Sequence, residues 1–283
     1  MESAILCRKM KKTYGSFTLD IEDFKVATGT VHGLIGANGS GKTTTIKLLL
    51  GLLFPDSGEL SVLGSSRISN EAETRQHIGF IVDDASVPSL VTANELAAVL
   101  RRCYQHWDQG QYEMYLRQFQ IDSKKQYRKY SKGMKVKLQL AVALSHHASL
   151  LILDEPTSGL DPLARDEIIS ILSEFSKDEN HTILISSHIT SDLEKLCDYV
   201  TFLEEGCIRF TEEKDELLES YRLGIVSHQM VADIDSDSII AKREGSFQVE
   251  LLLRTEDVPS FLESRRLSLE ELIIFLSKGR SAV

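Results

Sequence analysis

The chain has 283 residues, of which 42% are hydrophobic and 26% charged. This composition excludes collagen-like and disordered proteins, and it suits one large core or a core with a smaller appendage. The formal net charge of -10 argues against a broad nucleic-acid-binding surface, because basic patches bind phosphate backbones. No apolar run approaches the ~18 to 20 residues that cross a bilayer, and residues 1–9 lack the apolar core of a signal peptide. We therefore expect a cytosolic globular protein whose membrane contact, if it has one, goes through a partner.

The cysteines and the basic runs carry weaker information. The four cysteines, Cys7, Cys103, Cys197 and Cys207, are scattered and show no CxxC spacing. This pattern favours reduced packing residues over a disulfide scaffold or a structural metal site. Basic residues cluster in 9–12 and 124–129. We interpret both runs as solvated faces, with contact to anionic lipid or to a partner as the alternative.

The N-terminal region predicts a small sheet followed by a strand and a helix. Residues 3–31 are interpreted as short strands separated by turns, and 17–21 alternate apolar and polar side chains. This pattern favours a small antiparallel layer. A buried strand is expected over 30–35, followed by a helix over 44–53 with an apolar stripe. The stripe consists of Ile46, Leu49, Leu50 and Leu53.

A glycine-rich run lies between that strand and that helix. Residues 36–43 read Gly-Ala-Asn-Gly-Ser-Gly-Lys-Thr, which fits the phosphate-loop pattern G-x-x-x-x-G-K-[ST]. Glycines let the backbone wrap a phosphate, and the helix N-terminus presents its positive dipole to the anion. We expect Lys42 to reach the β and γ phosphates and Thr43 to hold Mg²⁺. The predicted phosphate-binding residues are Gly36, Ala37, Asn38, Gly39, Ser40, Gly41, Lys42, Thr43 and Thr44.

The middle of the chain predicts a helical segment and then a β-α-β unit. Helical periodicity extends from Val87 to about Asp122 and indicates an inserted helical lobe. Strands over 150–153 and 182–186 flank a helix that opens at Asp161-Pro162, an N-cap carboxylate followed by proline at the first helical position. Such a unit implies parallel strand pairing.

The end of the chain, after residue 222, predicts a small accessory subdomain. Strand-like segments cover 224–228 and 246–253. A final helix follows, and Ser268-Leu269-Glu270-Glu271 has the spacing of a capping box. The chain contains no internal repeat or low-complexity tract.

Two acids end the strand at 150–153. Phosphoryl transfer needs a carboxylate to order Mg²⁺ and a group that activates water. Asp154 and Glu155 follow the apolar run directly, at the carboxyl edge of a parallel sheet, where ligands bind. We expect Asp154 to bind the Mg²⁺ held by Thr43, and Glu155 to act as the general base. The alternative is that both acids only cap the next turn.

Three motifs together resemble the nucleotide-binding subunits of ABC transporters. They are the phosphate loop, the run Leu-Asp-Glu-Pro-Thr-Ser-Gly-Leu-Asp at 153–161, and Ile-Ser-Ser-His at 185–188. The resemblance covers residues 1–222. It implies an α/β fold with a P-loop NTPase core, an antiparallel β layer and an inserted helical subdomain at about 87–135. Residues 1–222 form the ATP-binding domain, and 223–283 form a small C-terminal α+β accessory region. Two such subunits are expected to dimerise head to tail around two ATP molecules.

The resemblance also assigns roles to single residues. Tyr14 matches the aromatic residue that stacks on adenine, His188 the histidine that contacts the γ-phosphate, and Asp161 a carboxylate at the dimer interface. The alternatives are a surface or core tyrosine and a satisfied histidine at a strand end. The signature loop departs from the usual Leu-Ser-Gly-Gly-Gln, because residues 130–134 read Tyr-Ser-Lys-Gly-Met. Ser131 and Gly133 are kept, and they suit the γ-phosphate of ATP on the other subunit.

A second departure concerns the metal. Where the family usually has glutamine, this chain has Asp83, with Asp84 as the alternative if the alignment shifts. An aspartate can ligate Mg²⁺ but adds a negative charge near the triphosphate. The loop and lobe that follow are where the family docks its membrane subunit. Trp107 is one candidate for that contact, although core packing is the favoured role.

Within the family, the signature loop, the 187–195 run and the terminal helix look like bacterial exporter-type ATPases that serve separate ABC-2 type permeases. The resemblance implies a homodimer or a heterodimer with a sister subunit. It places the protein in the cytoplasm, on the inner face of the membrane. It also implies ATP and Mg²⁺ as cofactors and no nucleic acid partner. One alternative is an ABC ATPase that acts on ribosomes, DNA or another cytosolic macromolecule. A small-molecule kinase or GTPase is weaker, since no Asn-Lys-x-Asp motif occurs. The cargo does not follow from this sequence.

Overall fold

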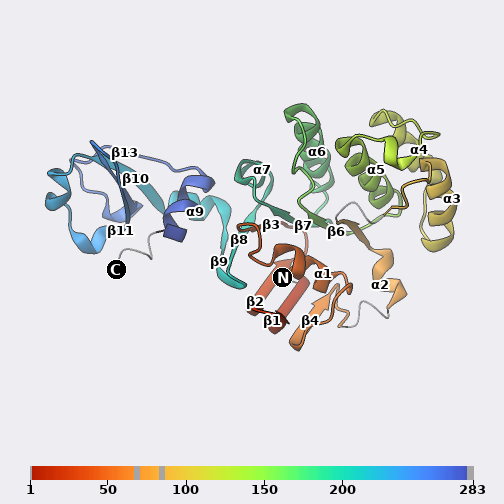
Figure 1. Cartoon of the computed structure of the whole chain (residues 1–283), viewed down its shortest axis with the longest axis horizontal. Helices are drawn as coiled ribbons and strands as arrows, with labels where there is room; N and C mark the ends of the chain where they lie inside the picture. Colours follow the sequence, from red (N-terminus) through yellow and green to blue (C-terminus); the bar gives the residue numbers. More distant parts are fainter. Residues whose placement is uncertain (1, 67–70, 83–86, 279–283) are drawn as a thin grey trace. The chain divides into compact units, whose positions relative to one another are not determined.

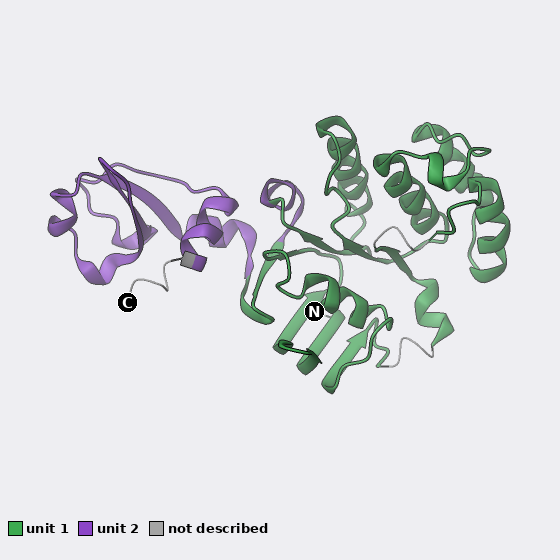
Figure 2. Ribbon diagram, in the orientation of Figure 1, with its two compact units in different colours: residues 1–189, 199–211 green, residues 190–198, 212–283 purple. Residues whose placement is uncertain are grey.

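The computed structural model describes residues 2–66, 71–82 and 87–278. Its contacts divide the chain into two compact units (Figure 2). Unit 1 comprises residues 1–189 and 199–211, and unit 2 comprises residues 190–198 and 212–283. The chain therefore enters unit 2 twice, first for the short segment 190–198 and then for the C-terminal region.

Within the described residues, a nine-stranded sheet organises unit 1, in the order β4-β1-β2-β9-β8-β3-β7-β6-β5 (Figure 1). Its strands are β1 Ser3–Tyr14, β2 Phe17–Ala27, β3 Val31–Ile35, β4 Ser57–Val62, β5 Ile78–Ile81, β6 Leu150–Asp154, β7 Thr182–Ser187, β8 Tyr199–Glu204 and β9 Cys207–Glu213. β1 pairs antiparallel with β2 and β4, whereas parallel pairings join β8, β3, β7, β6 and β5. The expected antiparallel layer is present, but residues 3–27 form two long strands rather than several short ones.

Six helices accompany this sheet in the part of unit 1 that the structure describes. They are α1 Lys42–Leu49, α2 Ala72–Gln76, α3 Ala93–Cys103, α4 Gln109–Gln118, α5 Lys132–Ser145 and α6 Pro162–Phe175, and a 3-10 turn covers Tyr127–Lys129. In Figure 1, α1 lies between the parallel strands and the β1-β2-β4 layer, and α5 and α6 cover the opposite face. Because helices cover both faces, the strand residues Leu150 to Leu153 are all fully buried.

Local signals explain where these helices begin. The carboxylate of Asp161 accepts hydrogen bonds of 3.1 Å from the amides of Leu163 and Ala164, and Pro162 occupies the first turn of α6. Thr92 forms a complete capping box with Glu95 at the start of α3. α3 and α4 then pack around Tyr112, which is fully buried and donates to the Ala93 carbonyl at 3.0 Å. The helical segment expected after Val87 thus has a core of its own.

The helix after the phosphate loop is shorter than predicted. It was expected to reach Leu53, but α1 ends at Leu49. Gly51 follows with φ +67°, and its amide donates to the Leu48 carbonyl at 3.0 Å. Glycine adopts this left-handed conformation without a side-chain penalty, and it commonly ends a helix in this way. The apolar periodicity therefore continued past the point where the backbone turns.

Unit 2 is built on an antiparallel sheet, which in the described residues has four strands in the order β11-β12-β10-β13. Its elements are α7 Thr190–Leu196, α8 Lys214–Glu219, β10 Tyr221–Val226, β11 Ile239–Glu244, β12 Val249–Arg254, β13 Ser264–Arg265 and α9 Leu269–Lys278, with 3-10 turns at Met230–Asp233, Ser236–Ser238 and Thr255–Asp257. The predicted capping box forms at α9, because Ser268 Oγ accepts from the Glu271 amide at 3.3 Å and Glu271 Oε2 accepts from the Ser268 amide at 3.0 Å.

The two strands predicted in this region are shifted from their expected places. β10 begins at Tyr221 rather than Gly224, and β12 begins at Val249 rather than Ser246. The amide of Gly245 donates to the Gln248 carbonyl at 2.8 Å, so residues 245–248 form the hairpin turn between β11 and β12. No helix among the residues described above is both long enough and apolar enough to cross a membrane.

Candidate active site

The phosphate loop connects the end of β3 to the start of α1, and its glycines occupy positions that other residues would strain. A Cβ on Gly36 would lie 2.3 Å from the Leu203 carbonyl oxygen, which leaves no room for a side chain. Gly39 and Gly41 have φ values of +83° and +114°. Only glycine adopts such angles readily, so the loop geometry depends on these residues.

The inside of the loop carries positive charge and unused hydrogen-bonding capacity. Lys42 is buried, and its Nζ donates to the carbonyls of Gly36 at 2.8 Å and Ala37 at 3.3 Å. Ser40 is also buried, and its hydroxyl has no hydrogen-bond partner among the described residues. A buried hydroxyl is normally satisfied, so this one is available to a ligand or to water. Together with the N-terminus of α1, these groups fit an anionic phosphate.

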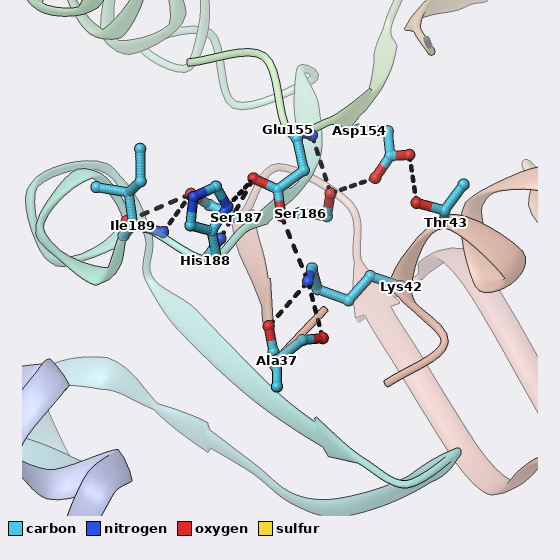
Figure 3. A network of polar contacts seen from close by, with 10 residues as sticks. Ala37, Lys42, Thr43, Asp154, Glu155, Ser186, Ser187, His188 and Ile189 are labelled. Carbon is cyan, nitrogen blue, oxygen red and sulfur yellow. Dashed lines mark hydrogen bonds and ion pairs between the residues drawn. The ribbon is translucent and has the colours of Figure 1, made fainter. Parts of the chain in front are cut away.

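Asp154 faces the start of α1 from the neighbouring part of the sheet. β3, β7 and β6 are adjacent parallel strands, and Asp154 at the end of β6 is in register with Ser186 at the end of β7. Thr43 Oγ1 donates to Asp154 Oδ2 at 2.7 Å (Figure 3). A hydroxyl and a carboxylate are oxygen donors of the kind that Mg²⁺ prefers, so these residues fit that ion.

Glu155 connects the lysine of the loop to the histidine after β7. Its Oε1 lies 3.3 Å from Lys42 Nζ, and its Oε2 lies 2.6 Å from His188 Nδ1 (Figure 3). The backbone of Glu155 has φ +50°, which is disfavoured for a residue with a side chain. This turn directs the Glu155 carboxylate toward Lys42 and His188. The structure thus brings together the five polar residues that the sequence predicted here: Lys42, Thr43, Asp154, Glu155 and His188.

The sequence analysis left two serines of β7 without a role; Ser186 joins this network, and Ser187 bonds the residue that follows His188. Ser186 Oγ donates to Asp154 Oδ1 at 2.6 Å, and Ser187 Oγ accepts from the Ile189 amide at 2.9 Å (Figure 3). Both serines are fully buried. They stand at the end of β7, after the apolar residues Ile183 to Ile185 and before the histidine. That position is a usable sequence signal, because ligands bind beyond the carboxyl ends of parallel strands.

Of the predicted site residues beyond the phosphate loop that the structure describes, four have no place in this network. Tyr14 is 42% exposed beside the β1-β2 turn, where Lys12 Nζ is 5.6 Å from its ring centre. Ser131 caps α5 by accepting from the Met134 amide at 3.3 Å, and Asp161 caps α6. A Cβ on Gly133 would lie 3.2 Å from that of Ala164, so the first turns of α5 and α6 pack closely. Asp83, and its alternative Asp84, fall outside the described residues.

Buried histidines and cysteines elsewhere have shifted pKa values but take no part in this network. Burial lowers the pKa of His32 to about 4, and its Nε2 is 2.7 Å from Thr201 Oγ1. Burial raises the pKa of Cys7 to about 12. Both groups are therefore neutral near pH 7 and belong to the packing of the sheet.

Comparison with known proteins agrees with this geometry. A family model described as ABC transporter matches residues 19–158. The bacitracin transport ATP-binding protein BcrA of Bacillus licheniformis is 38% identical, over 73% of this chain and 68% of that protein. The lantibiotic transport ATP-binding protein SrtF of Streptococcus pyogenes is 35% identical, over 74% of this chain and 90% of that protein. The ABC transporter ATP-binding protein YtrB of Bacillus subtilis (strain 168) is 28% identical, over 94% of this chain and 95% of that protein.

Solved structures share the fold. A structure of an ATP-binding subunit of an ABC transporter superposes with a TM-score of 0.67 at 28% identity, covering 76% of this chain and 92% of that one. The P-loop core, the antiparallel layer and the helical segment follow the arrangement that the sequence predicted. The chain belongs to the ABC transporter family as an ATP-binding subunit, and it is an ATPase.

Proposed function

We propose that this ATPase powers export by a separate ABC-2 type permease, and that two copies, or one copy and a sister subunit, close around two ATP molecules. The observation that carries this proposal is the continuous network from Lys42 through Glu155 to His188, next to Thr43 and Asp154. The names of relatives such as the bacitracin and lantibiotic transport proteins support a transport role of this kind.

Nucleotide binding uses the phosphate loop and one aromatic side chain. Lys42 and the amides of residues 36–44 hold the phosphates, and Tyr14 stacks on adenine. The buried Lys42 ammonium and the unsatisfied Ser40 hydroxyl support this assignment. Thr43 and Asp154, with Asp83 as a further ligand, hold Mg²⁺, which when bound neutralises charge that develops on the phosphates.

Hydrolysis uses the two side chains that meet beyond β6 and β7. Glu155 accepts the proton of the attacking water, and His188 contacts the γ-phosphate. The 2.6 Å contact between Glu155 Oε2 and His188 Nδ1 supports a joint role, because it holds the base and the phosphate-sensing side chain next to each other. Lys42 lies against the same carboxylate and also keeps it near the phosphate loop.

The signature loop supplies the reason for a dimer. Ser131 and Gly133 begin α5, where a helix N-terminus can bind phosphate. The Ser131 hydroxyl accepts from the Met134 amide at 3.3 Å, so it lies at the exposed N-terminus of α5. We assign Ser131 and Gly133 to the ATP on the opposite subunit, and Asp161 to the interface between subunits.

A groove in unit 1 is the proposed contact for the permease. It has a volume of about 510 Å³ and is bordered by α2, β5 and α3. Its lining is mostly apolar and includes Leu52 and Phe80, with Arg75 as a charged member. Such a groove suits an amphipathic helix of the membrane subunit. Trp107, the other candidate, is half-buried with its ring 5.0 Å from that of Tyr112, which supports a packing role.

The proposal also covers location and domain roles. The protein resides in the cytoplasm and reaches the inner face of the membrane through its permease. The ATP-binding domain is assigned to residues 1–222, with the helical subdomain at about 87–135, and the accessory subdomain to residues 223–283. The boundary at 222 lies within β10, and the compact units divide earlier, at residue 212, with 190–198 also in unit 2. An affinity-tagged chain in mild detergent should recover a permease that stimulates its ATP hydrolysis. Recovery of ribosomal proteins or DNA instead would contradict this partner assignment.

Glu155→Gln tests the catalytic assignment. This variant keeps the shape of the side chain but removes the base, so it should bind ATP, lose most turnover and accumulate as an ATP-bound dimer. Phosphate release measures turnover, and light scattering after gel filtration measures the dimer. Glu179→Gln, at an exposed glutamate between α6 and β7, is the matched control and should behave as the unaltered protein. Normal hydrolysis by Glu155→Gln would remove Glu155 from the role of base.

A further inference from the structure

Ser186 lies between the two acids of the site. It is the fifth residue of β7 and is fully buried. Its Oγ donates to Asp154 Oδ1 at 2.6 Å and accepts from the Glu155 amide at 3.0 Å (Figure 3). One hydroxyl therefore contacts both consecutive residues at the end of β6.

The chemistry of the three groups determines the direction of these bonds. A carboxylate only accepts hydrogen bonds, and a backbone amide only donates them. The single proton of the hydroxyl therefore goes to Asp154, and a lone pair of the same oxygen receives the Glu155 amide. Alanine would remove both bonds, whereas threonine can make both.

Each bond fixes a different part of the site. Asp154 Oδ2 is held by Thr43 at 2.7 Å, so with Ser186 on Oδ1 both oxygens of the carboxylate are held by hydroxyls. Ser186 also bonds the backbone amide of Glu155, a residue whose φ is +50°. The surrounding structure must stabilise such a backbone, and Ser186 contributes through both its hydroxyl and its carbonyl oxygen, the latter at 3.2 Å.

We propose that Ser186 is a positioning residue for ATP hydrolysis. Its hydroxyl orients the Asp154 carboxylate for the divalent cation, and it holds the backbone turn from which Glu155 reaches the attacking water. This inference rests on the functions proposed above for Asp154 and Glu155. Ser186 itself contacts neither ATP nor water in this role.

The test compares Ser186→Ala with Ser186→Thr in the full chain. For Ser186→Ala we expect kcat and the affinity for Mg²⁺ in the ATP complex to fall about tenfold or more, as is typical when a residue that orients a metal ligand is removed. ATP binding in EDTA, measured by calorimetry, should change by less than about twofold, because the phosphate loop is untouched. Ser186→Thr should restore both the Mg²⁺ response and kcat.

Thr182→Val is the matched control. Thr182 is a buried residue at the other end of β7, and its hydroxyl accepts from the Gly29 amide at 2.9 Å. Removing that hydroxyl should lower the melting temperature but leave the ratio of ATP affinities with and without Mg²⁺ unchanged. Ser186→Cys provides a second variant if Ser186→Ala fails to fold, because a thiol is similar in size but a weak donor.

The outcomes separate this inference from the proposed function. Turnover and Mg²⁺ response within about twofold of the unaltered protein, in Ser186→Ala or in a folded Ser186→Cys, would overturn the role of Ser186. An equal loss of ATP affinity with and without Mg²⁺ would also overturn it, because it would indicate general damage to the loop. Normal hydrolysis by Glu155→Gln would instead overturn the proposed function, whatever Ser186 does.

Discussion

At the carboxyl edge of β3, β7 and β6, polar side chains contact one another around Glu155, whose backbone is left-handed. In the four-stranded sheet of unit 2, by contrast, the buried cluster is apolar and ion pairs such as Arg265 with Glu271 are more exposed. In unit 1, the side chains of Thr43, Ser186 and His188 bond to the two acids at the end of β6. In unit 2, Leu251 and Leu253 are fully buried members of a hydrophobic cluster.

This difference teaches that the two sheets use polar groups for different purposes. Parallel strands end at the same edge, so polar side chains from neighbouring strands gather there and can act on one ligand. Antiparallel strands end at alternate edges, and their polar side chains mainly fix turns and caps. Arg265 and Glu271 illustrate the second case, because their ion pair joins β13 to the start of α9. We therefore expect substitutions in unit 1 to alter ATP binding and those in unit 2 to alter local stability.

The largest effect expected from this comparison comes from two matched core substitutions. Leu151→Ala in β6 and Leu251→Ala in β12 each remove a fully buried side chain, and each should cost about 2–5 kcal/mol of stability. Hydrogen exchange should rise in residues 150–154 for the first and in 249–254 for the second. Only Leu151→Ala should weaken ATP binding. A similar loss of ATP affinity in Leu251→Ala would show that the two units do not differ as proposed.

Lys42→Ala should produce the next largest effect. The buried ammonium is the charged donor inside the phosphate loop, and losing a hydrogen bond to a charged group costs about 1.5–3 kcal/mol. ATP affinity should therefore fall roughly tenfold to hundredfold, as measured by titration with a fluorescent nucleotide. Lys47→Ala, in the same helix, is the control and should bind normally. Unchanged binding in Lys42→Ala would remove this lysine from the phosphate site.

A smaller effect is expected at Tyr14. If adenine stacks on this ring, Tyr14→Ala should weaken ATP binding by about 1 kcal/mol or more, and Tyr14→Phe should keep it because the ring remains. The same titration with ATP and with inorganic triphosphate separates base from phosphate contacts. Equal affinity of Tyr14→Ala and the unaltered protein for ATP would leave Tyr14 as a surface residue.

The smallest effect concerns the acid stability of unit 2. Hydrogen bonding to Arg265 lowers the pKa of Glu271 from its ordinary 4.5 to about 2. The folded state therefore favours the ionised carboxylate, and its contribution to stability is present above about pH 4.5 and is lost as the pH falls toward about 2. Glu271→Gln should lower the melting temperature at neutral pH, and the difference from the unaltered protein should shrink in acid.

Glu270→Gln provides the control for this titration. Glu270 is the exposed neighbour of Glu271 on the first turn of α9. Its substitution should leave both the melting temperature and its pH dependence nearly unchanged. A melting-temperature difference for Glu271→Gln that stays constant from neutral pH to about 3 would contradict the role of the ionised carboxylate.

Much of the site was predictable because its residues carry strong local signals. The glycine pattern of the phosphate loop, the acids that end an apolar run and the proline after Asp161 each dictate a local structure. The two serines of β7 were present in the motif but received no role. Their function depends on which strand lies beside β7, and the register of Asp154 with Ser186 joins residues 32 positions apart. No local pattern contains that information.

The sequence by itself determined the ABC family, the phosphate loop, the two acids and the caps of α6 and α9, because each depends on residues close together in the chain. Only the tertiary structure decided that α1 ends at Leu49, that the hairpin turn replaces the start of the predicted strand at Ser246, and that one buried hydroxyl contacts both acids. These features depend on how the backbone turns and on contacts between distant strands, which apolar periodicity does not encode.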